Sequence, residues 1–473
     1  MLTNDTKYTD TIQKYFPWAL VLVVLFFSTY RLTESPPVWY DEGIYHQSAI
    51  NLLRAGDFGL QVEPDVFASA SNSTVGFPLI YPVALSFGLF DVGVLQARSV
   101  MVVFILLLVF YAYFLLKNLF GFKVAAYSSS LLATFPVLYG NGKSTLGEVP
   151  GMFFLILFLF FIYKLEESDF KDIRWYILAG LAGGLCVVTK PIFFILLPAL
   201  AFSVFFLRKK ITFIIKPILI FVFAFLIPVA LWISTQFKVS DSLPHIFAFY
   251  ATPSGVGDAL GLVVDNMFRL ISEASPAFLL LVFLAWAFSV FIRRLKISLA
   301  ECTAFFFSFL ILVAYLRTLG WYRYFFEAQI LSLIFLPYAL YSMTHTRRFA
   351  PLIITILIAL NVYQLGFRSF TAEYYTSTAT ADIERYLSLY PINTSFFVYN
   401  APEVVIFLPS GNYYQYIKPR PDQIIGEEQL GKIEAGVPDE IIIYSNTYEQ
   451  IKDEFVLYAP KDRIGRYTIL KKI

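Results

Sequence analysis

Long apolar runs separated by short polar connectors make up most of the chain. The first run extends from about Phe16 to Leu32, close to the roughly 20 residues that span a bilayer. No Ala-x-Ala-like cleavage site follows it, so we expect a retained span and not a signal peptide. Ten further runs lie at about residues 97–116, 124–140, 147–163, 174–189, 191–207, 212–233, 275–292, 298–316, 325–343 and 349–367. None alternates strictly between apolar and polar residues, which favours about eleven transmembrane helices over the strands of a membrane barrel.

Two connectors are much longer than the others, residues 33–96 and 234–274. In the first of them, Gly43 to Ala55 reads as a helix with Ala49, Ile50 and Leu53 on one face, which suits the membrane interface. Gly76 to Phe90 is again apolar but is short and broken by proline. We therefore expect a second interfacial or re-entrant piece there and not a full span.

The composition changes after Phe370, where polar residues become frequent. Residues 381–390 and 446–455 are predicted to be helical. Ser395–Tyr399, Glu440–Tyr444 and Tyr467–Leu470 are predicted to be short strands. The predicted organisation is therefore an all-α polytopic membrane domain over 1–370 and a small soluble α/β domain over 371–473.

Composition supports this class. The chain is 58% hydrophobic and 15% charged, with a mean hydropathy of +0.67, whereas a soluble domain has about 45–50% apolar and about 25% charged residues. The net charge of +2 comes from scattered residues, so no nucleic-acid partner is expected. Cys186 and Cys302 lack the spacing of a disulfide framework or zinc site, and we expect both to be buried as small apolar residues.

The distribution of Lys and Arg predicts the orientation of the helices in the membrane. Alternate connectors are rich in them: Lys7, Lys14, Lys117, Lys123, Lys164, Lys171, Arg174, Arg208, Lys209, Lys210, Lys216, Arg293, Arg294, Lys296, Arg347 and Arg348. The connectors between these carry mostly single basic residues. By the positive-inside rule, the N-terminus is predicted to be cytoplasmic and the C-terminal domain outside.

The first candidate for chemistry is Trp39-Tyr40-Asp41-Glu42-Gly43, directly after the first span. An acidic pair at a helix start is favoured by the positive end of the helix dipole, so a purely structural role is one interpretation. The functional interpretation is a carboxylate at the membrane surface that removes a proton from a hydroxyl.

Three more segments carry charged residues on the side of the membrane that is predicted to be outside. They are residues 141–150 with Lys143 and Glu148, Thr189-Lys190-Pro191, and residues 320–327 with Arg323. Each also has a structural interpretation: a polar turn, a lysine that snorkels to the surface, and an ion pair between Arg323 and Glu327 one helical turn on. Ionisable residues at a membrane boundary are nevertheless functional candidates, and these lie beside the predicted interfacial helix.

The order of these elements resembles the GT-C glycosyltransferases, in particular the protein O-mannosyltransferase and lipid A aminoarabinose transferase superfamily. The resemblance covers about residues 15–345. It rests on Trp39 to Glu42, Gly76 to Pro82, Gly184-Leu185 through Thr189-Lys190-Pro191, and Arg323-Tyr324 before an apolar span that contains Pro337.

The resemblance implies a hexosyl- or pentosyltransferase that moves a sugar from a polyprenyl-phosphate donor to an acceptor hydroxyl, with inversion. It assigns Asp41 as the catalytic base and adds Glu42 as a second catalytic candidate that supports Asp41 or contacts the acceptor. Cations would stabilise the leaving phosphate, and the candidates are Lys190, Arg323 and Lys143. Candidates for contact with substrate, or for support of the site, are Glu148, Tyr40, Tyr322 and Tyr81. The expected location is a plasma (inner) membrane, with membrane lipids around the spans.

The resemblance implies no certain cofactor, although a divalent metal is possible, held by Asp41 with help from Glu63 and Asp65. His46, His245 and His345 are isolated in sequence, and we expect them at surfaces or interfaces.

Other functions stay open from the sequence. A transporter or lipid flippase without transferase activity is also polytopic, but it tends to place its charges near the midplane and to show inverted repeats. A scaffold that binds a partner outside the membrane, and a metal-dependent oligosaccharide transferase, are further alternatives. The acceptor is a lipid, a glycan or a protein.

Overall fold

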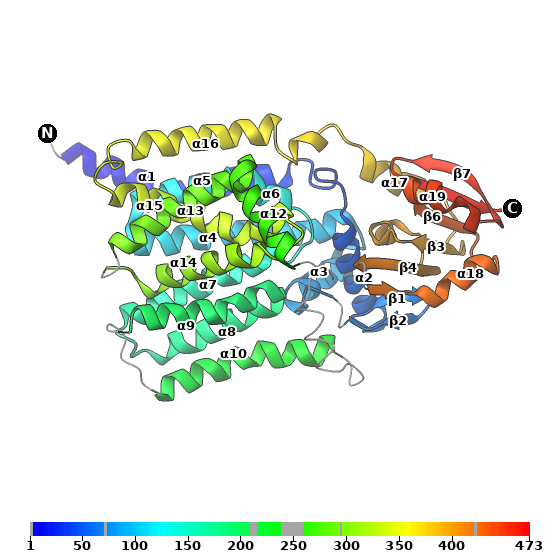
Figure 1. Cartoon of the computed structure of the whole chain (residues 1–473), viewed down its shortest axis with the longest axis horizontal. Coiled ribbons are helices and arrows are strands. Elements are labelled where there is room, and N and C mark those ends of the chain that lie inside the picture. The colour runs from blue at the N-terminus through cyan, green and yellow to red at the C-terminus, as the bar shows by residue number, and fades with distance from the viewer. Residues whose placement is uncertain (1–2, 71–72, 209–214, 238–258, 294–295, 421–422) are drawn as a thin grey trace.

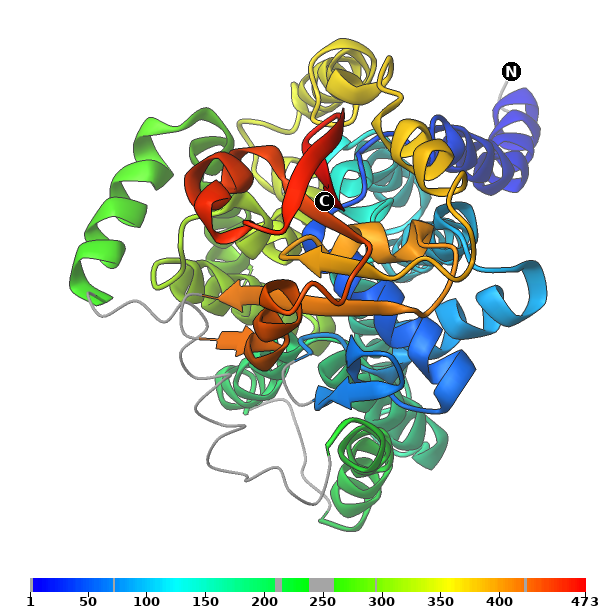
Figure 2. The same cartoon turned by 90° about the vertical axis from the view of Figure 1, so that its right-hand side faces the viewer.

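The computed structural model describes residues 3–473 except 71–72, 209–214, 238–258, 294–295 and 421–422. A bundle of long helices forms one part of the molecule and a twisted sheet with short helices forms the other (Figure 1). Helix α2 (Tyr40–Ala55) and the hairpin of β1 (Leu60–Glu63) and β2 (Val66–Ala68) lie between the two parts. Figure 2 shows the sheet domain covering one end of the bundle.

The bundle contains a helical segment at each of the eleven predicted runs. Those helices are α1 (Thr3–Thr29), α4 (Val94–Phe120), α5 (Phe122–Ala133), α6 (Pro136–Gly142), α7 (Glu148–Glu167), α8 (Ile173–Thr189), η2 (Pro191–Ile195), α9 (Leu196–Phe206), α10 (Ile215–Gln236), α13 (Ala274–Ile292), α14 (Leu299–Tyr315), η3 (Tyr322–Phe325), α15 (Phe326–Ser342) and α16 (Ala350–Phe367). Helices α3 (Phe77–Phe90) and α12 (Ala259–Ser272) lie in the two long connectors.

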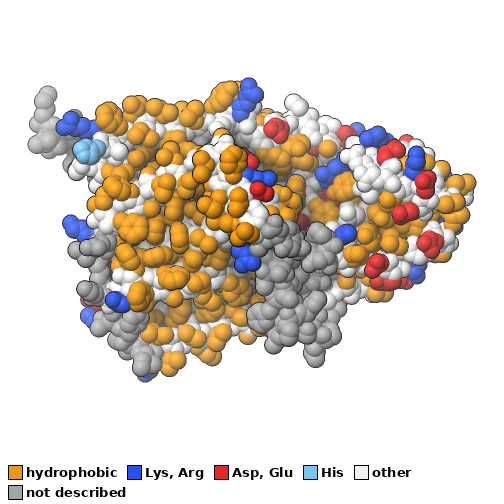
Figure 3. All heavy atoms as spheres, in the orientation of Figure 1, with side chains coloured by type: hydrophobic (Ala, Val, Ile, Leu, Met, Phe, Trp, Pro, Cys, Tyr) orange, Lys and Arg blue, Asp and Glu red, His pale blue; other side chains and the backbone are white. Residues whose placement is uncertain are grey.

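Within the described ranges, seven helical segments are long and apolar enough to cross a membrane, and α3, α8, α14 and the segment Pro191–Phe206 are shorter apolar helices. The side of the bundle seen in Figure 3 is largely apolar, with charged side chains gathered at its two ends, one far from the sheet domain and one beside it. Water-facing helices have a polar face; this surface instead suits lipid. The prediction of a polytopic helical membrane protein is confirmed.

One predicted run is not a single helix. The run 124–140 is split into α5 and α6, with Thr134 and Phe135 between them. Proline disfavours a helical conformation at the residue before it, and Phe135 before Pro136 is extended, with φ −75° and ψ 116°. The prediction of one continuous span was therefore wrong here.

The C-terminal domain holds a six-stranded sheet in the order β5-β4-β3-β6-β8-β7. The central strands β3 (Phe396–Tyr399) and β6 (Glu440–Tyr444) are parallel and pair Phe397 with Ile441, and β8 (Tyr467–Lys472) runs antiparallel to β6. The other elements are η4 (Ala372–Tyr374), α17 (Ala379–Leu387), η5 (Pro402–Phe407), β4 (Tyr413–Arg420), β5 (Gln423–Ile425), η6 (Glu427–Gln429), α18 (Leu430–Glu434), α19 (Ser445–Ile451), η7 (Lys452–Glu454) and β7 (Tyr458–Ile464). The predicted α/β domain is confirmed, while its boundary at residue 370 stays a prediction.

Polar contacts fix the C-terminal domain against the segment that starts α2. The Glu403 carboxylate in η5 accepts hydrogen bonds from Arg466 Nη2 at 2.8 Å and from the Tyr467 hydroxyl at 2.6 Å. Arg466 also donates to the Val38 carbonyl oxygen at 2.9 Å. Glu403 is 1% exposed. The two ends of the chain are thereby joined beside the candidate site.

Candidate active site between the bundle and the C-terminal domain

The first turn of α2 positions two carboxylates in different environments. Trp39, extended at φ −96° and ψ 152°, precedes the helix, and its backbone N–H donates to Glu42 Oε2 at 3.2 Å. A Glu at the third helical position that accepts this N–H is one half of a capping box. Glu42 therefore turns back into the protein, whereas the Asp41 side chain is 29% exposed.

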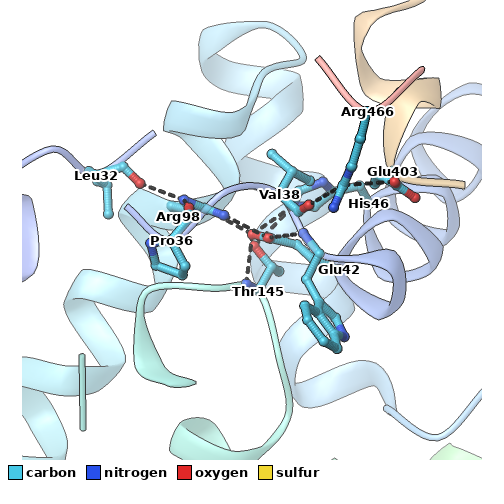
Figure 4. Close-up of polar contacts among 10 residues, drawn as sticks. Leu32, Pro36, Val38, Glu42, His46, Arg98, Thr145, Glu403 and Arg466 are labelled. Atoms are coloured by element: carbon cyan, nitrogen blue, oxygen red, sulfur yellow. Dashed lines mark hydrogen bonds and ion pairs between the residues drawn. The ribbon is translucent and has the colours of Figure 1, made fainter. Parts of the chain in front are cut away.

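Glu42 is bound on both oxygens by Arg98 of α4. Arg98 Nε lies 2.8 Å from Oε1 and Nη2 lies 2.7 Å from Oε2, and neither side chain is exposed. Arg98 Nη1 donates to the carbonyl oxygens of Leu32 and Pro36, and the Thr145 N–H donates to Glu42 Oε1 (Figure 4). Burial alone would raise the pKa of Glu42, but Arg98, His46 and the Thr145 N–H lower it to about 2.

This buried network changes the interpretation of two residues. Glu42, which the resemblance counted among the catalytic candidates, is fully buried and has both oxygens bonded to Arg98 and to backbone N–H groups, and these contacts hold the start of α2 against α4. His46, expected at a surface or interface, is fully buried, with Nε2 3.0 Å from Thr145 Oγ1. Burial, with a smaller contribution from Arg98, lowers the pKa of His46 to about 4 against the opposing effect of Glu42.

Asp41 faces Arg323 instead. Arg323 Nη1 lies 2.7 Å from Asp41 Oδ2. The guanidinium lies over the rings of Trp39, Trp321 and Tyr324, at 5.8, 4.9 and 5.5 Å from their centroids. Aromatic faces attract a cation, so the guanidinium is held in place while its side chain keeps 18% exposure.

The ion pair between Arg323 and Glu327, which was the structural interpretation of this segment, is absent from the described part of the chain. Arg323 belongs to η3, whereas Glu327 belongs to α15, which starts at Phe326. The regular spacing of an α-helix, which places residues four apart on one face, therefore does not connect them. Glu327 is 1% exposed, and neither carboxylate oxygen has a hydrogen-bond partner among the described residues.

A second ion pair joins two of the other predicted segments. Lys190 is extended between α8 and η2, and its Nζ binds Glu148 Oε1 at the start of α7. The Glu148 side chain is 2% exposed and that of Lys190 is 19% exposed. Glu148 also interacts electrostatically with Arg323 and with Glu327. Asp41, Arg323, Glu148, Lys190 and Glu327 therefore form one charged cluster.

Lys143 lies apart from this cluster. It is 1% exposed, and its Nζ donates to the Tyr30 carbonyl oxygen at 2.7 Å. Burial and the neighbouring Arg98 lower its pKa to about 7. The structure therefore connects Lys143 with the Arg98 network and gives it no contact with Lys190 or Arg323 among the described residues.

The three predicted tyrosines take separate places. The Tyr40 hydroxyl donates to Asn400 Oδ1 of the C-terminal domain at 2.8 Å. Tyr322 binds Glu273, which follows α12. Tyr81 on α3 is 41% exposed and lines an open apolar hollow with Leu52, Pro82 and Leu85. Only Tyr40 and Tyr322 are direct neighbours of cluster residues in sequence.

The residues proposed to help bind a metal point elsewhere. Glu63 Oε1 lies 3.3 Å from Lys432 Nζ of the C-terminal domain, and Asp65 is in the turn of the β1–β2 hairpin, with φ 62°. Among the described residues no group of three His, Cys, Asp or Glu side chains could hold a metal ion. The donor set therefore does not fit a metal shared by Asp41, Glu63 and Asp65.

Comparison with known proteins finds a sequence family that matches part of the chain and solved structures that share its fold. Residues 77–232 match the family model of the dolichyl-phosphate-mannose-protein mannosyltransferases. Comparison with curated protein sequences finds no match.

Solved structures match over nearly the whole chain. ArnT from Cupriavidus metallidurans in the apo state superposes with a TM-score of 0.68 at 15% identity, covering 98% of each chain. The same protein bound to undecaprenyl phosphate gives a TM-score of 0.66 at 14% identity, with 97% of each chain covered. The oligosaccharyltransferase of Archaeoglobus fulgidus gives 0.56 at 12% identity, covering 91% of this chain and 70% of the other. The predicted resemblance to the GT-C superfamily is therefore confirmed, in fold along nearly the whole chain and in sequence over residues 77–232.

Proposed function

We propose that the chain transfers a sugar from a polyprenyl-phosphate donor to an acceptor hydroxyl on the outer face of the membrane, with inversion at the anomeric carbon. The donor sugar is a hexose or a pentose, and the acceptor belongs to a lipid, a glycan or a protein. The N-terminus is cytoplasmic and the C-terminal domain is outside, in a plasma (inner) membrane.

One observation carries this proposal. Asp41, a partly exposed carboxylate, is in contact with a cation, Arg323, and a second cation, Lys190, belongs to the same cluster. Asp41 belongs to α2, and this helix lies between the apolar helix bundle and the C-terminal sheet domain (Figure 1). A substrate that combines a lipid chain, a phosphate and a sugar needs such a position, because its chain belongs among apolar helices and its sugar belongs in water.

The structural relatives support the donor class. ArnT has been crystallised with undecaprenyl phosphate. The archaeal oligosaccharyltransferase AglB has been solved with an inhibitory peptide and a dolichol-phosphate. Both lipids are polyprenyl phosphates, which is the leaving group that the proposed reaction releases.

In the proposed reaction, Asp41 accepts the proton of the acceptor hydroxyl as its oxygen attacks the anomeric carbon. The bond from that carbon to the phosphate oxygen breaks with its electron pair leaving on the lipid phosphate. Attack from the face opposite the phosphate inverts the configuration. The products are the glycosylated acceptor, the polyprenyl phosphate and a proton on Asp41.

The two cations act on the leaving group. Arg323 presents a planar fork that matches phosphate oxygens and Lys190 presents a point charge. Each has a carboxylate partner: Glu148 for Lys190 and Asp41 for Arg323. A phosphate that binds Arg323 replaces Asp41 as its partner, which releases the carboxylate to serve as base. Donor binding therefore activates the base in this mechanism.

The test uses purified full-length protein in lipid, supplied with a panel of polyprenyl-phosphate sugars and a crude acceptor extract. Release of polyprenyl phosphate is followed for the native chain, for Asp41→Asn and for a matched control, Asp453→Asn, at an exposed aspartate of η7. We expect release by the native chain and the control, and loss of release in Asp41→Asn.

Equal release by Asp41→Asn would remove Asp41 as the base. Absence of release with every donor, from folded protein that moves labelled lipid across a vesicle membrane, would favour the alternative of a transporter or flippase.

A further inference from the structure

A polar pocket of about 180 Å³ lies between the C-terminal half of α2 and the sheet domain. Asn51 and Arg54 contribute to it from α2, Gln61 from β1, Ser410 from the segment that leads into β4, and Tyr413 from the start of β4. Arg54 follows Asp41 by thirteen positions along α2, which is about 20 Å at the rise of an α-helix. The pocket is therefore separate from the charged cluster.

Arg54 brings an uncompensated positive charge to this pocket. Its side chain forms no ion pair or hydrogen bond within the described part of the chain. A Cβ placed on Gly411 would lie 3.8 Å from Arg54 Nη1 and 3.8 Å from Gln61 Oε1. The absence of a side chain at position 411 thus leaves the guanidinium and the amide oxygen open to the same space.

Three further polar groups have unused hydrogen-bonding capacity. The Asn51 amide nitrogen donates to Gly59, and that of Gln61 donates to Gly411 and Tyr413, so both amide oxygens are left over. The Tyr413 hydroxyl takes part in no hydrogen bond with the described residues. Asn51 and Tyr413 are each 3% exposed. All three residues line the pocket, so the pocket is the space from which a hydrogen-bond partner for these groups can come.

The chemistry of the lining identifies the class of ligand. The guanidinium binds a carboxylate or phosphate, the two amide oxygens accept from hydroxyls, and the Tyr413 hydroxyl can donate or accept. Ile50, Val405 and Ile406 supply apolar wall, which suits the C–H face of a ring. The volume has room for roughly ten water-sized groups, and that matches a single sugar ring.

We propose that this pocket binds one anionic sugar unit, with its carboxylate or phosphate on Arg54 and its hydroxyls on Asn51, Gln61 and Tyr413. A position in the last turn of α2 favours a cation through the helix dipole, but the dipole does not account for the unused groups around it. The binding does not require the transfer reaction, so the proposal stands independently of the role of Asp41.

The experiment measures direct binding to the full-length protein in lipid nanodiscs, without donor, by saturation-transfer NMR and calorimetry. The probes are glucuronate, glucose 6-phosphate and neutral glucose. The variants are Arg54→Gln, which removes the charge from an exposed side chain, and Tyr413→Phe, which removes one hydroxyl. Arg385→Gln, at an exposed arginine of α17, is the matched control.

We expect at least one of the two anionic sugars to bind the native chain and Arg385→Gln equally. We expect its affinity to fall at least tenfold in Arg54→Gln and severalfold in Tyr413→Phe, with unchanged melting temperatures. Binding of only one anionic sugar identifies the anion as carboxylate or phosphate. Equal binding of glucose, unchanged affinity in Arg54→Gln, or no binding of any probe would overturn the proposal.

Discussion

The two acidic residues at the start of α2 are adjacent in sequence but differ in burial and in the partners that they bind. Asp41 is partly exposed and has one partner, whereas Glu42 is sealed from solvent and has a bidentate partner, two backbone N–H groups and a nearby histidine. A partly exposed pair contributes little to stability because water screens it. Removing one partner of a buried pair leaves an uncompensated charge.

The variants Glu42→Gln and Asp41→Asn should therefore separate stability from activity. We expect Glu42→Gln to lower the free energy of unfolding by about 3–5 kcal/mol, because Arg98 stays buried without its counter-charge. Asp41→Asn should change stability by about 1 kcal/mol or less while abolishing release of polyprenyl phosphate. Thermal unfolding in detergent and the release assay measure the two effects. A stable Glu42→Gln variant would show that the Arg98 network does not hold α2.

His46 makes stability depend on pH. The pKa of His46 is lowered from 6.5 to about 4, mainly by burial. Below pH 6.5 this histidine is therefore protonated in the unfolded chain while it is still neutral in the folded chain. Stability is therefore lost as the pH falls from about 6.5 toward 4, by about 3 kcal/mol in total. Glu42, with its pKa lowered from 4.5 to about 2, adds a loss only below pH 4.5.

The pH prediction is checked by melting temperatures between pH 7.5 and 5. We expect the native chain to lose stability over this window and His46→Gln to lose much less, since glutamine does not titrate. His345→Gln, at an exposed histidine, is the control and should follow the native curve. Parallel curves for all three proteins would contradict the assignment to His46.

At the scale of elements, docking of the C-terminal domain on α2 depends on a close approach of two backbones. A Cβ on Gly43 would lie 2.2 Å from the Glu403 Cα and 2.3 Å from its backbone nitrogen. Such a contact cannot be relieved by a side-chain rotation, so α2 and η5 have to separate. The partners across this interface include Gln47 with Gln415, at 2.9 Å, which would be strained as well.

We therefore expect Gly43→Ala to lower the melting temperature and to increase protease cleavage near residue 370. Gly431→Ala is the control, because a Cβ on Gly431 in α18 meets nothing within 4 Å. Alanine favours a helix over glycine by roughly 1 kcal/mol, so this control should be as stable as the native chain or more so. Equal behaviour of the two variants would argue against the close approach.

Helices and strands could be predicted from the sequence where their surroundings require a run of apolar residues. The apolar runs face lipid or other helices, and the central strands Phe396–Tyr399 and Glu440–Tyr444 have buried side chains on both faces of the sheet, so each of these elements contains a continuous hydrophobic stretch. Strand β7 was missed because it is an exposed edge strand that contains Pro460, and edge strands need no apolar pattern. The hairpin β1–β2 was not predicted because its two strands are too short to show a recognisable hydrophobic pattern.

For the site, segments could be predicted but partners could not. Asp41, Glu148, Lys190 and Arg323 stood out because charges are rare at a membrane boundary. Arg98 was overlooked inside an apolar run, although an arginine in that position requires a buried acid as partner. Which acid pairs with which base depends on how helices far apart in sequence pack. The structure pairs Arg323 with Asp41 and not with Glu327, the partner that local spacing had offered as the structural interpretation.

At the scale of the whole molecule, the proposed function requires the charged cluster and the C-terminal domain on one side of the membrane. Lys171, between α7 and α8, should then face the cytoplasm, and Asp453 of η7 should face outward. Both side chains are exposed, and the native Cys186 and Cys302 are buried. Single cysteines placed at the two exposed positions therefore report sidedness against a low background.

In intact cells, a membrane-impermeant thiol reagent should label Asp453→Cys and leave Lys171→Cys unlabelled until the membrane is permeabilised. The physical basis is the excess of Lys and Arg in the connectors on the side of Lys171. The reverse pattern would place the cluster in the cytoplasm, where the proposed acceptors outside the membrane are out of reach. Because the helices cross the membrane as one packed bundle, that single result would contradict the proposed location of the reaction outside the membrane. The description of the fold would not change.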